Sequence, residues 1–363
     1  MKEFELIEKI FTPLTQSPQK TNHKTKLSNP NILTKFDPLN LQNDVAIIEL
    51  DSKSNLVLSK DLMCEGVHFL KSDDGFKIAS KLLLSNLSDI ASSGATPLCY
   101  MLGFTKNNSL TKTFYTEFGR ALSKIQNQYK IKLIGGDTSN SKSLHYSITI
   151  FGVALKDKLL LRQNAQNGDF IFVSNTVGDA FLGLNLKLKN SANLKTHEKK
   201  LLDKHFYPQP RIELSKQLVE QNLSKCATDI SDGLIADLTN ICNASKLNAQ
   251  IFLSQIPISS SALKYLQTNS DLSKLDLLSG GDDYELIFSV DPKNIHKIQK
   301  LSKKLNLRLT CIGKFTNEKF DKKTYPKKLK KYPKKFNVFL FNSAKNISPD
   351  NIINLNKKGY EHQ

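Results

Sequence analysis

The stretch Cys226-Ala-Thr-Asp-Ile-Ser-Asp-Gly-Leu234 joins a short apolar strand to the first turn of a helix. Residues 226–229 are predicted to form the strand, and Ser231 and Asp232 open a helix that runs to about Ser245. Two carboxylates, those of Asp229 and Asp232, therefore flank Ser231 at a strand-to-helix turn. The stretch indicates a fold that mixes strands and helices, with acidic side chains at the ends of its apolar segments.

Acidic residues lie at the ends of apolar segments in several other places. A single aspartate at such a place is commonly a turn or N-cap residue. Six such places in one chain, two of them beside diglycines, instead indicate a ligand site. Besides the turn at Asp229, they are Asp44 before the first predicted strand, Asp61 at the end of the second, Asp89 on a helix face shared with Asn86, Asp137 after Gly135-Gly136, and Asp282-Asp283 after Gly280-Gly281.

These carboxylates lack histidine or cysteine partners with metal-ligand spacing, which favours magnesium over zinc. Magnesium prefers carboxylate oxygen atoms and is usually bound together with substrate phosphates. A diglycine lets backbone N–H groups approach a phosphate closely. The sequence therefore predicts magnesium and a phosphorylated ligand, although it contains neither G-x-x-x-x-G-K-[ST] nor G-x-G-x-x-G.

Several predicted strands follow one another directly, which favours two α/β (or α+β) domains over one doubly wound sheet. The polar stretch 162–168 marks the boundary between an N-terminal domain at 1–160 and a C-terminal domain at 161–363. Residues 1–14 are predicted as a helix and 15–43 as a long polar loop. The periodicity predicts strands at 45–50, 56–60, 97–105, 131–134, 144–155, 169–174, 226–229, 284–290 and 308–313, and helices at 75–93, 110–128, 179–189, 197–205, 211–222, 231–245 and 293–304.

Composition restricts the class of protein. Of the 363 residues, 39% are hydrophobic and 24% charged, as in globular proteins with a packed core. No apolar run is long enough for a membrane-spanning helix, and the acidic start is unlike a signal peptide, so we expect a cytoplasmic protein. The five cysteines form no C-x-x-C pair and suit a reducing compartment.

The net charge of +18 comes mostly from lysine spread along the chain. One dense segment, 325–336, contains two Tyr-Pro-Lys-Lys units. No recognition helix or RNA-binding signature accompanies it, so we expect a solvated lysine-rich loop and no nucleic-acid partner.

Six segments of the chain, taken in order, resemble those of thiamine-monophosphate kinases. Asp229-Ile-Ser-Asp-Gly-Leu234 is similar to D-I-S-D-G-L, and Leu133-Ile-Gly-Gly-Asp-Thr138 to L-I-G-G-D-T. Ser279-Gly-Gly-Asp-Asp-Tyr-Glu-Leu286 resembles S-G-G-E-D-Y-E-L. The others are 61–69, which resembles D-x-x-x-E-G-x-H-F, 85–97, which resembles V-N-L-S-D-x-A-A-M-G-A-x-P, and 358–362, which resembles the start of G-Y-x-H-F.

The resemblance implies a homodimer with an N-terminal ATP-binding domain built on a mixed sheet and a C-terminal α/β domain. This architecture is shared with aminoimidazole-ribonucleotide and selenophosphate synthetases. It also implies ATP as co-substrate, several magnesium ions, and transfer of the γ-phosphoryl group to thiamine monophosphate. The product would be thiamine diphosphate, made in the last step of its biosynthesis.

The matching segments also imply roles for individual residues. The catalytic residues would be Asp61, Asp89, Asp229 and Asp232, and magnesium would be held by Asp44, Ser59, Asp61, Asp89, Asp137, Asp229 and Asp232. ATP would contact Gly136, Asp137, Arg162 and Ser231, and thiamine would contact His68, Asp282 and Tyr360. The accepting phosphate is already anionic, so no general base is needed, and the residues must instead overcome repulsion between two polyanions.

Some positions depart from the family pattern. The family loop G-I-G-D-D-A is replaced by Leu41-Gln-Asn-Asp-Val-Ala46, in which both glycines are missing and Asn43 leaves one acid fewer. Lys60 stands where the family usually has threonine. Asp282 replaces glutamate, and the chain ends His362-Gln363. These changes leave the number of magnesium ions open, and Lys60 is expected either to face the phosphates or to lie on the surface.

Two alternatives follow. The chain could be a degenerate, nucleotide-binding member of the superfamily without kinase turnover. It could also be another enzyme of the superfamily, but the reactive N-terminal cysteine of selenophosphate synthetases and the C-terminal cysteine of the hydrogenase-maturation relative are absent.

Overall fold

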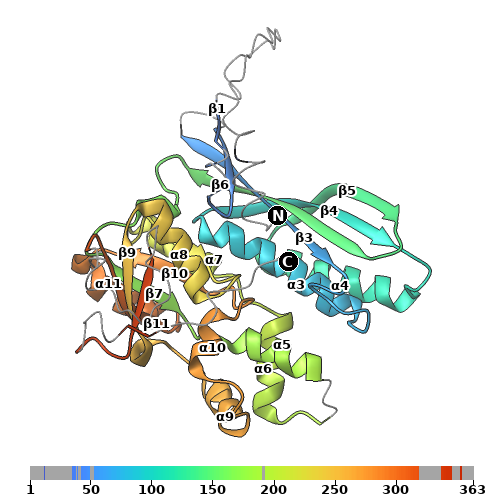
Figure 1. Cartoon of the computed structure of the whole chain (residues 1–363). Helices are drawn as coiled ribbons and strands as arrows, with labels where there is room; N and C mark the ends of the chain where they lie inside the picture. The colour runs from blue at the N-terminus through green and yellow to red at the C-terminus, as the bar shows by residue number, and fades with distance from the viewer. Residues whose placement is uncertain are drawn as a thin grey trace, which may run out of the picture. The chain divides into compact units, whose positions relative to one another are not determined.

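A computed structural model describes residues 12, 35–37, 39, 42–49, 53–189, 193–318, 337–345 and 352–353. The chain divides into two compact units (Figure 1): unit 1 runs to Leu159, and unit 2 begins at Leu160. Each unit has its own sheet and helices, which confirms the predicted mixed α/β fold class. The predicted helix at 1–14, apart from Thr12, the lysine-rich segment 325–336 and Tyr360 lie outside the described residues.

Unit 1 is built on a six-stranded sheet with the order β1-β2-β3-β6-β4-β5. Neighbouring strands are antiparallel except β4 and β5, which run parallel. Two long helices pack against one face of this sheet (Figure 1). The strands are β1 (Lys35–Asp37), β2 (Ala46–Glu49), β3 (Ser54–Cys64), β4 (Thr96–Lys106), β5 (Lys132–Asn140) and β6 (His145–Leu155), and the helices are α3 (Gly75–Ser92) and α4 (Lys112–Tyr129).

Helix α3 is buried along almost its whole length. Its N-terminus is capped by Asp74, whose carboxylate accepts a hydrogen bond of 2.8 Å from the backbone N–H of Lys77. Ile78, Leu82 and Ile90 recur at helical spacing and are fully or almost fully buried. Burial of each such side chain contributes about 1.5–3 kcal/mol. The helix that carries Asp89 is therefore held firmly in the core of unit 1.

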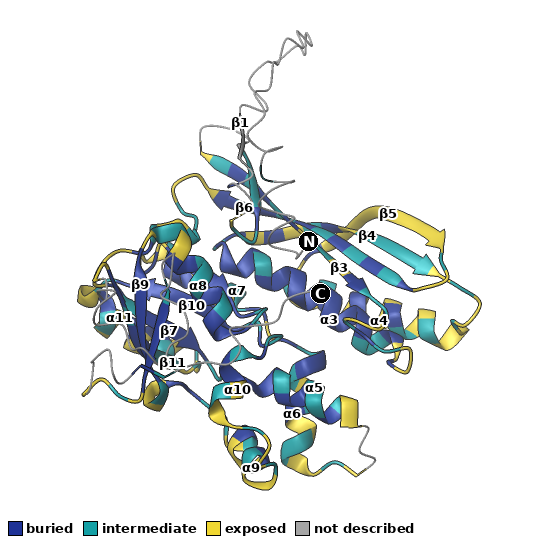
Figure 2. Cartoon of the chain, in the orientation of Figure 1, coloured by how far each residue is buried: buried dark blue, intermediate teal, exposed yellow. Residues whose placement is uncertain are grey.

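The opposite face of the unit 1 sheet has no covering helix among the described residues of this unit. Strand alternation places Leu62 of β3 and Met101 of β4 on this face, where they are 53% and 41% exposed. Strand β5, at the edge of the sheet, is exposed along its whole length (Figure 2). Among the described residues, unit 1 thus presents a sheet face with exposed apolar side chains beside Lys60 and an edge strand, β5, that no further strand covers.

Unit 2 contains a second six-stranded sheet, with the order β12-β9-β11-β7-β10-β8. Its neighbouring strands are antiparallel except β12 and β9. The strands are β7 (Phe170–Ser174), β8 (Ala227–Asp229), β9 (Asn248–Phe252), β10 (Leu286–Val290), β11 (Leu309–Thr316) and β12 (Val338–Phe341). The helices are α5 (Asp179–Lys189), α6 (Thr196–Phe206), α7 (Ile212–Glu220), α8 (Leu234–Ser245), α9 (Ser260–Thr268), α10 (Lys274–Ser279) and α11 (Ile295–Lys304).

The sheet of unit 2 is buried on both faces. Ile287 of β10 packs into a cluster with Leu234 and Leu238 of α8. Its neighbour Phe288 points the other way, into a cluster with Leu218 of α7 and further residues of α11. Strands covered on both faces read as continuous apolar runs, which explains sequences such as Phe-Ile-Phe-Val in β7.

The predicted elements match the structure where periodicity is strong and differ elsewhere. Strand β5 runs from Lys132 to Asn140, so the prediction that it ends before the diglycine is wrong. Strand β3 continues through Asp61 to Cys64, and β1 lies within the stretch predicted as a loop. Elements β9, α9, α10 and β12 had no counterpart in the prediction. No helix among the described residues is both long and apolar enough to cross a membrane.

Candidate active site

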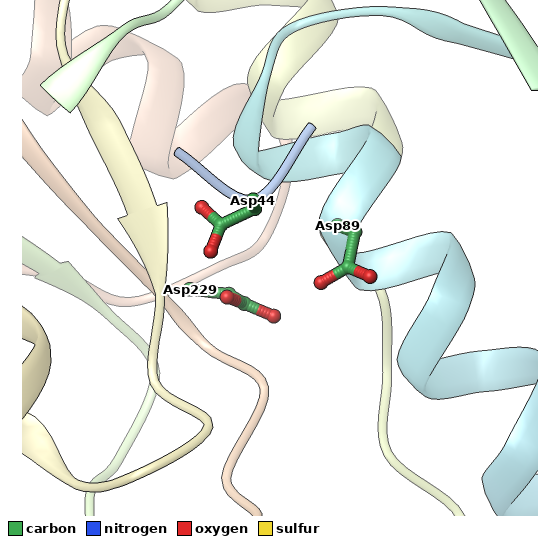
Figure 3. A group of neighbouring side chains, drawn as sticks. All are labelled: Asp44, Asp89 and Asp229. Carbon is green, nitrogen blue, oxygen red and sulfur yellow. The ribbon is translucent and has the colours of Figure 1, made fainter. Parts of the chain in front are cut away.

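An acid cluster forms in unit 1 where β3, α3 and the segment before β2 meet. Asp61 projects from β3, Asp89 from α3, and Asp44 precedes β2. Oxygen atoms of Asp44 and Asp89 lie within 4.8 Å of each other, and Figure 3 shows both side chains. Asp229, which Figure 3 also labels, belongs to unit 2. The structure thus brings together three acids of the first half of the chain that the sequence singled out.

Each acid of this cluster accepts a hydrogen bond from a serine. Ser59 Oγ donates to Asp89 Oδ2 at 2.6 Å. Ser85 Oγ donates to Asp61 Oδ2 at 3.1 Å, and Ser92 Oγ donates to Asp44 Oδ2 at 3.0 Å. The prediction omitted Ser85 and Ser92, although their spacing from Asp89 places all three on one face of α3. These hydroxyls fix the orientation of the carboxylates.

Burial disfavours ionisation of one acid of the cluster, Asp61. Burial raises the pKa of Asp61 above its usual value, the hydrogen bond from Ser85 opposes this, and the nearby charge of Asp44 adds to it. Several carboxylates surrounded by hydroxyl oxygens form an oxygen-only donor set, which fits magnesium. The residues present are therefore those that a magnesium ion would require.

Lys60 lies on the other face of β3. It pairs with Thr149 of β6, whereas Ser59 and Asp61 pair with Ile150 and Ile148 on the helix-covered side. The Nζ atom of Lys60 is 3.5 Å from Thr149 Oγ1 and 3.4 Å from a second hydroxyl, that of Ser147. The sequence left open whether Lys60 faces the phosphates or lies on the surface. In the structure it lies on the surface.

His68 lies in the turn after β3. Its Nδ1 accepts a hydrogen bond of 3.1 Å from the backbone N–H of Cys64, so a neutral ring carries its proton on Nε2. This contact fixes the ring relative to the end of the strand that carries Asp61. His68 is half-buried and so remains partly accessible to a ligand.

The diglycine of β5 makes a close approach to β4. Gly136 has a φ of +154°, and a Cβ atom there would lie 2.0 Å from the carbonyl oxygen of Leu102. Only glycine fits at this position. Asp137 pairs with Gly103 in the exposed strand β5. Its carboxylate is not one of those whose oxygen atoms lie within 4.8 Å of Asp44 and Asp89.

In unit 2, the loop between β8 and α8 carries the second set of predicted site residues. Asp229 ends β8, and Ser231 and Asp232 follow in the loop. The guanidinium of Arg162 donates to Thr228 Oγ1 from Nε at 3.1 Å and from Nη2 at 3.0 Å. The predicted residues Arg162 and Asp229 are thus positioned on the same part of unit 2.

A second loop, residues 280–285, is held against the first. The backbone N–H of Asp282 donates to Ser231 O, and that of Tyr284 donates to Ile230 O, both at 2.8 Å. A Cβ atom at Gly281 would lie 2.1 Å from Ser231 O, so the diglycine permits this contact. Asp282 and Tyr284 have φ values of +70° and +50°, left-handed conformations that are strained for residues other than glycine.

The carboxylate of Asp282 has a polar neighbour near each of its oxygen atoms. Tyr284 Oη lies 3.4 Å from Oδ1, and Nδ1 of the buried His205 lies 3.4 Å from Oδ2. Asp282 keeps about a quarter of its side chain exposed, at 26%, so it can still meet a ligand. His205, which comes from α6, was not among the residues predicted from the sequence.

The other two acids of this loop are structural. Asp283 accepts hydrogen bonds from the N–H groups of Gly178 and Ala180 at the start of α5, and burial raises its pKa well above its usual value. Glu285 forms a buried ion pair with Arg211 and accepts a hydrogen bond of 2.6 Å from Ser174 Oγ. These contacts anchor the loop that positions Asp282.

Two family models of AIR synthase related proteins match the chain, the N-terminal domain over residues 42–154 and the C-terminal domain over residues 166–325. A thiamine-monophosphate kinase of Buchnera aphidicola is 36% identical over 318 residues, 86% of this chain and 91% of the relative. One of Haemophilus influenzae is 37% identical over 282 residues, 77% of this chain and 84% of the relative. The chain belongs to the thiamine-monophosphate kinase family within the AIR synthase related proteins.

Solved structures agree in fold. The structure of AaThiL complexed with AMPPCP and TMP matches with a TM-score of 0.78 at 24% identity, covering 100% of this chain and 97% of that chain.

Proposed function

We propose that this protein transfers the γ-phosphoryl group of ATP to thiamine monophosphate and so forms thiamine diphosphate. Its family membership and the names of relatives at 36% and 37% identity support this assignment. AaThiL, which shares the fold, binds AMPPCP and TMP. A degenerate protein without turnover is not favoured, because six acids of the family pattern remain: Asp44, Asp61, Asp89, Asp137, Asp229 and Asp232.

The observation that carries this function is the cluster of Asp44, Asp61 and Asp89, each held by a serine hydroxyl. It supplies negative charge and oxygen ligands in one place without histidine or cysteine, as a magnesium-dependent phosphotransferase requires. We assign magnesium binding to Asp44, Ser59, Asp61, Asp89 and Asp137 in unit 1 and to Asp229 and Asp232 in unit 2. When bound, magnesium would screen the phosphates and stabilise charge in the transition state.

The chain's own residues bind and orient the two anionic reactants. The accepting phosphate needs no general base, so the carboxylates of Asp61, Asp89, Asp229 and Asp232 serve as metal ligands rather than proton acceptors. The planar guanidinium of Arg162, held beside Thr228, is suited to a phosphate of ATP. Transfer is direct, without a covalent enzyme intermediate.

ATP and the thiamine part of the second substrate are assigned to different residues. Gly136, Asp137, Arg162 and Ser231 would contact ATP. His68 and Asp282, both partly accessible, would contact the thiamine end, as would Tyr360 outside the described residues. We propose that residues 1–160 form the N-terminal domain that binds ATP and magnesium. Residues 161–363 form the C-terminal α/β domain, which contributes Arg162, Ser231, Asp229 and Asp232.

We also propose that the protein is a homodimer. Leu62 and Met101 are exposed on the sheet face of unit 1 that no helix covers among the residues described for that unit. Exposed apolar faces of this kind mark interaction surfaces, and the open edge of β5 adds unpaired backbone groups. We place the enzyme in the cytoplasm, where ATP is available and where five cysteines without a disulfide are stable.

The test is a turnover assay of the full chain with ATP, magnesium and thiamine monophosphate. We expect thiamine diphosphate as product, detected by chromatography, and no diphosphate when free thiamine is the acceptor. Omission of magnesium should abolish product formation. Formation of product from thiamine but not from its monophosphate would overturn the substrate assignment, and an absence of turnover in folded protein would favour the degenerate alternative.

A further inference from the structure

Asp237 lies in the first turns of α8, and its carboxylate reaches back to the loop before the helix. Its Oδ2 accepts hydrogen bonds from the backbone N–H groups of Ser231 and Asp232 at 3.0 Å each, and of Gly233 at 3.1 Å. Only 1% of Asp237 is exposed. One buried carboxylate therefore binds consecutive amides of the loop that carries the predicted site residues of unit 2.

This contact differs from ordinary helix capping. A capping side chain precedes the helix and accepts from the first helical amides. In α8 the N-cap is Gly233, which has no side chain, and Asp237 accepts from amides at and before the cap. The carboxylate therefore shapes the loop itself.

The arrangement also limits what the loop can bind. A turn with glycine before a helix commonly directs its N–H groups at a phosphate. Here those of Ser231, Asp232 and Gly233 are directed at Asp237 instead. The carbonyl oxygens of Ile230 and Ser231 accept from Tyr284 and Asp282. The backbone is held on both sides, and the loop can meet a ligand mainly through side chains.

We propose that Asp237 is a positioning residue. It holds loop 229–233 so that the side chains of Asp229, Ser231 and Asp232 form a ligand set for metal and nucleotide, with the loop amides closed to phosphate. This role depends on the metal and ATP contacts proposed above for these side chains. The carboxylate of Asp237 accepts the backbone N–H groups that, in glycine-rich phosphate loops, donate to a phosphate.

The experiment compares Asp237→Ala and Asp237→Asn with Asp169→Asn in the full chain. Asp169 is also a buried aspartate that accepts a backbone hydrogen bond, from Gln166, but it lies at the opposite end of the sheet from Asp229. Hydrogen exchange of peptides covering residues 229–233 is measured without metal or nucleotide. Loss of charge-assisted hydrogen bonds should speed exchange by about tenfold or more in Asp237→Ala.

Magnesium titrations of turnover supply the second measurement. We expect the half-saturating magnesium concentration to rise about tenfold in Asp237→Ala, less in Asp237→Asn, which keeps an oxygen acceptor, and not in Asp169→Asn. Asp237→Asn also serves if the alanine variant does not fold. Faster loop exchange with an unchanged magnesium dependence, or unchanged exchange, would overturn the positioning role.

A parallel Asp229→Asn variant separates this inference from the proposed function. Full activity of folded Asp229→Asn would refute the metal role of the loop. An inactive Asp229→Asn together with normal Asp237 variants would refute only the inference about Asp237.

Discussion

Ser59 Oγ on β3 donates a hydrogen bond of 2.6 Å to Asp89 Oδ2 on α3, and so joins strand and helix at the acid cluster. Because the acceptor is a carboxylate, this bond is worth about 1.5–3 kcal/mol. We predict that Ser59→Ala lowers kcat/KM about tenfold or more at limiting magnesium. Ser93→Ala is the control, since Ser93 is a buried serine whose hydroxyl donates only to the helix carbonyl of Ile90. Equal activity of the two variants would contradict a role for Ser59.

Asp61→Asn and Asp229→Asn should each abolish phosphoryl transfer while the protein stays folded. Each removes the charge of a proposed magnesium ligand, and electrostatic contacts of this kind are commonly worth about a hundredfold or more in kcat. Turnover and circular dichroism of the purified variants would check this. Asp157→Asn, at an exposed turn, is the control and should keep full activity. Near-normal turnover in a folded Asp229→Asn variant would refute the mechanism.

The N-cap of α3 should make stability depend on pH. Burial opposes ionisation of Asp74, but hydrogen bonds with Lys77 and the charge of Lys77 outweigh it and hold the pKa of Asp74 below its usual value. Its contribution is therefore present above the unfolded-state pKa and is lost as pH falls through the lowered folded-state pKa. We predict that Asp74→Ala costs about 1 kcal/mol at neutral pH.

This difference between wild type and Asp74→Ala should shrink in acid, as measured by urea unfolding. Asp74→Ser keeps a capping oxygen and should recover most of the loss at neutral pH. A difference that is constant across the acid range would show that the charge of Asp74 is irrelevant.

Lys60→Thr should leave the magnesium dependence of turnover unchanged. The sequence also allowed Lys60 to supply positive charge beside Asp61, in which case threonine would steepen that dependence. Because Lys60 lies on the opposite sheet face, near Ser147 and Thr149, we expect no effect. A magnesium titration of the variant decides between the two, and a steeper curve would mean that the lysine reaches the acids.

Leu62→Asp should weaken the proposed dimer. A charge placed on the uncovered sheet face would have to be desolvated when a second copy packs there. Sedimentation velocity should show a shift towards monomer at micromolar concentration. Leu188→Asp, at a 62% exposed leucine of α5 in unit 2, should leave the association state unchanged. A dimer that survives Leu62→Asp would place the interface elsewhere.

The fold could be predicted where one face of an element is consistently apolar. Helices α3 and α4 agree closely with the prediction because their buried residues recur at helical spacing. The diglycine of β5 was misleading, because Gly136 continues the ladder through close contact with Leu102 instead of ending it. Strand β9, Asn-Ala-Gln-Ile-Phe, was missed because polar residues interrupt its buried run.

The acids of the site could be predicted, whereas most of their partners could not. Asp44, Asp61 and Asp89 were apparent from their places beside apolar segments, and the spacing of Ser85 and Ser92 on α3 would have identified those serines as well. Asp237, four residues after Gly233, was missed despite its local spacing, whereas His205 and Arg211 reach the site loops only through the folding of unit 2. A single sequence carries no signal for contacts of that kind.

The alternation of Ser59, Lys60 and Asp61 along β3 makes the acid cluster sensitive to strand register. A slip of one residue against β6 turns every side chain of a strand to the other face. It would bring the ammonium of Lys60 under α3, beside Asp89, and would expose Asp61 on the open face. A slipped pairing of β3 with β6 would therefore remove from the cluster both the carboxylate of Asp61 and the hydroxyl of Ser59, which donates to Asp89.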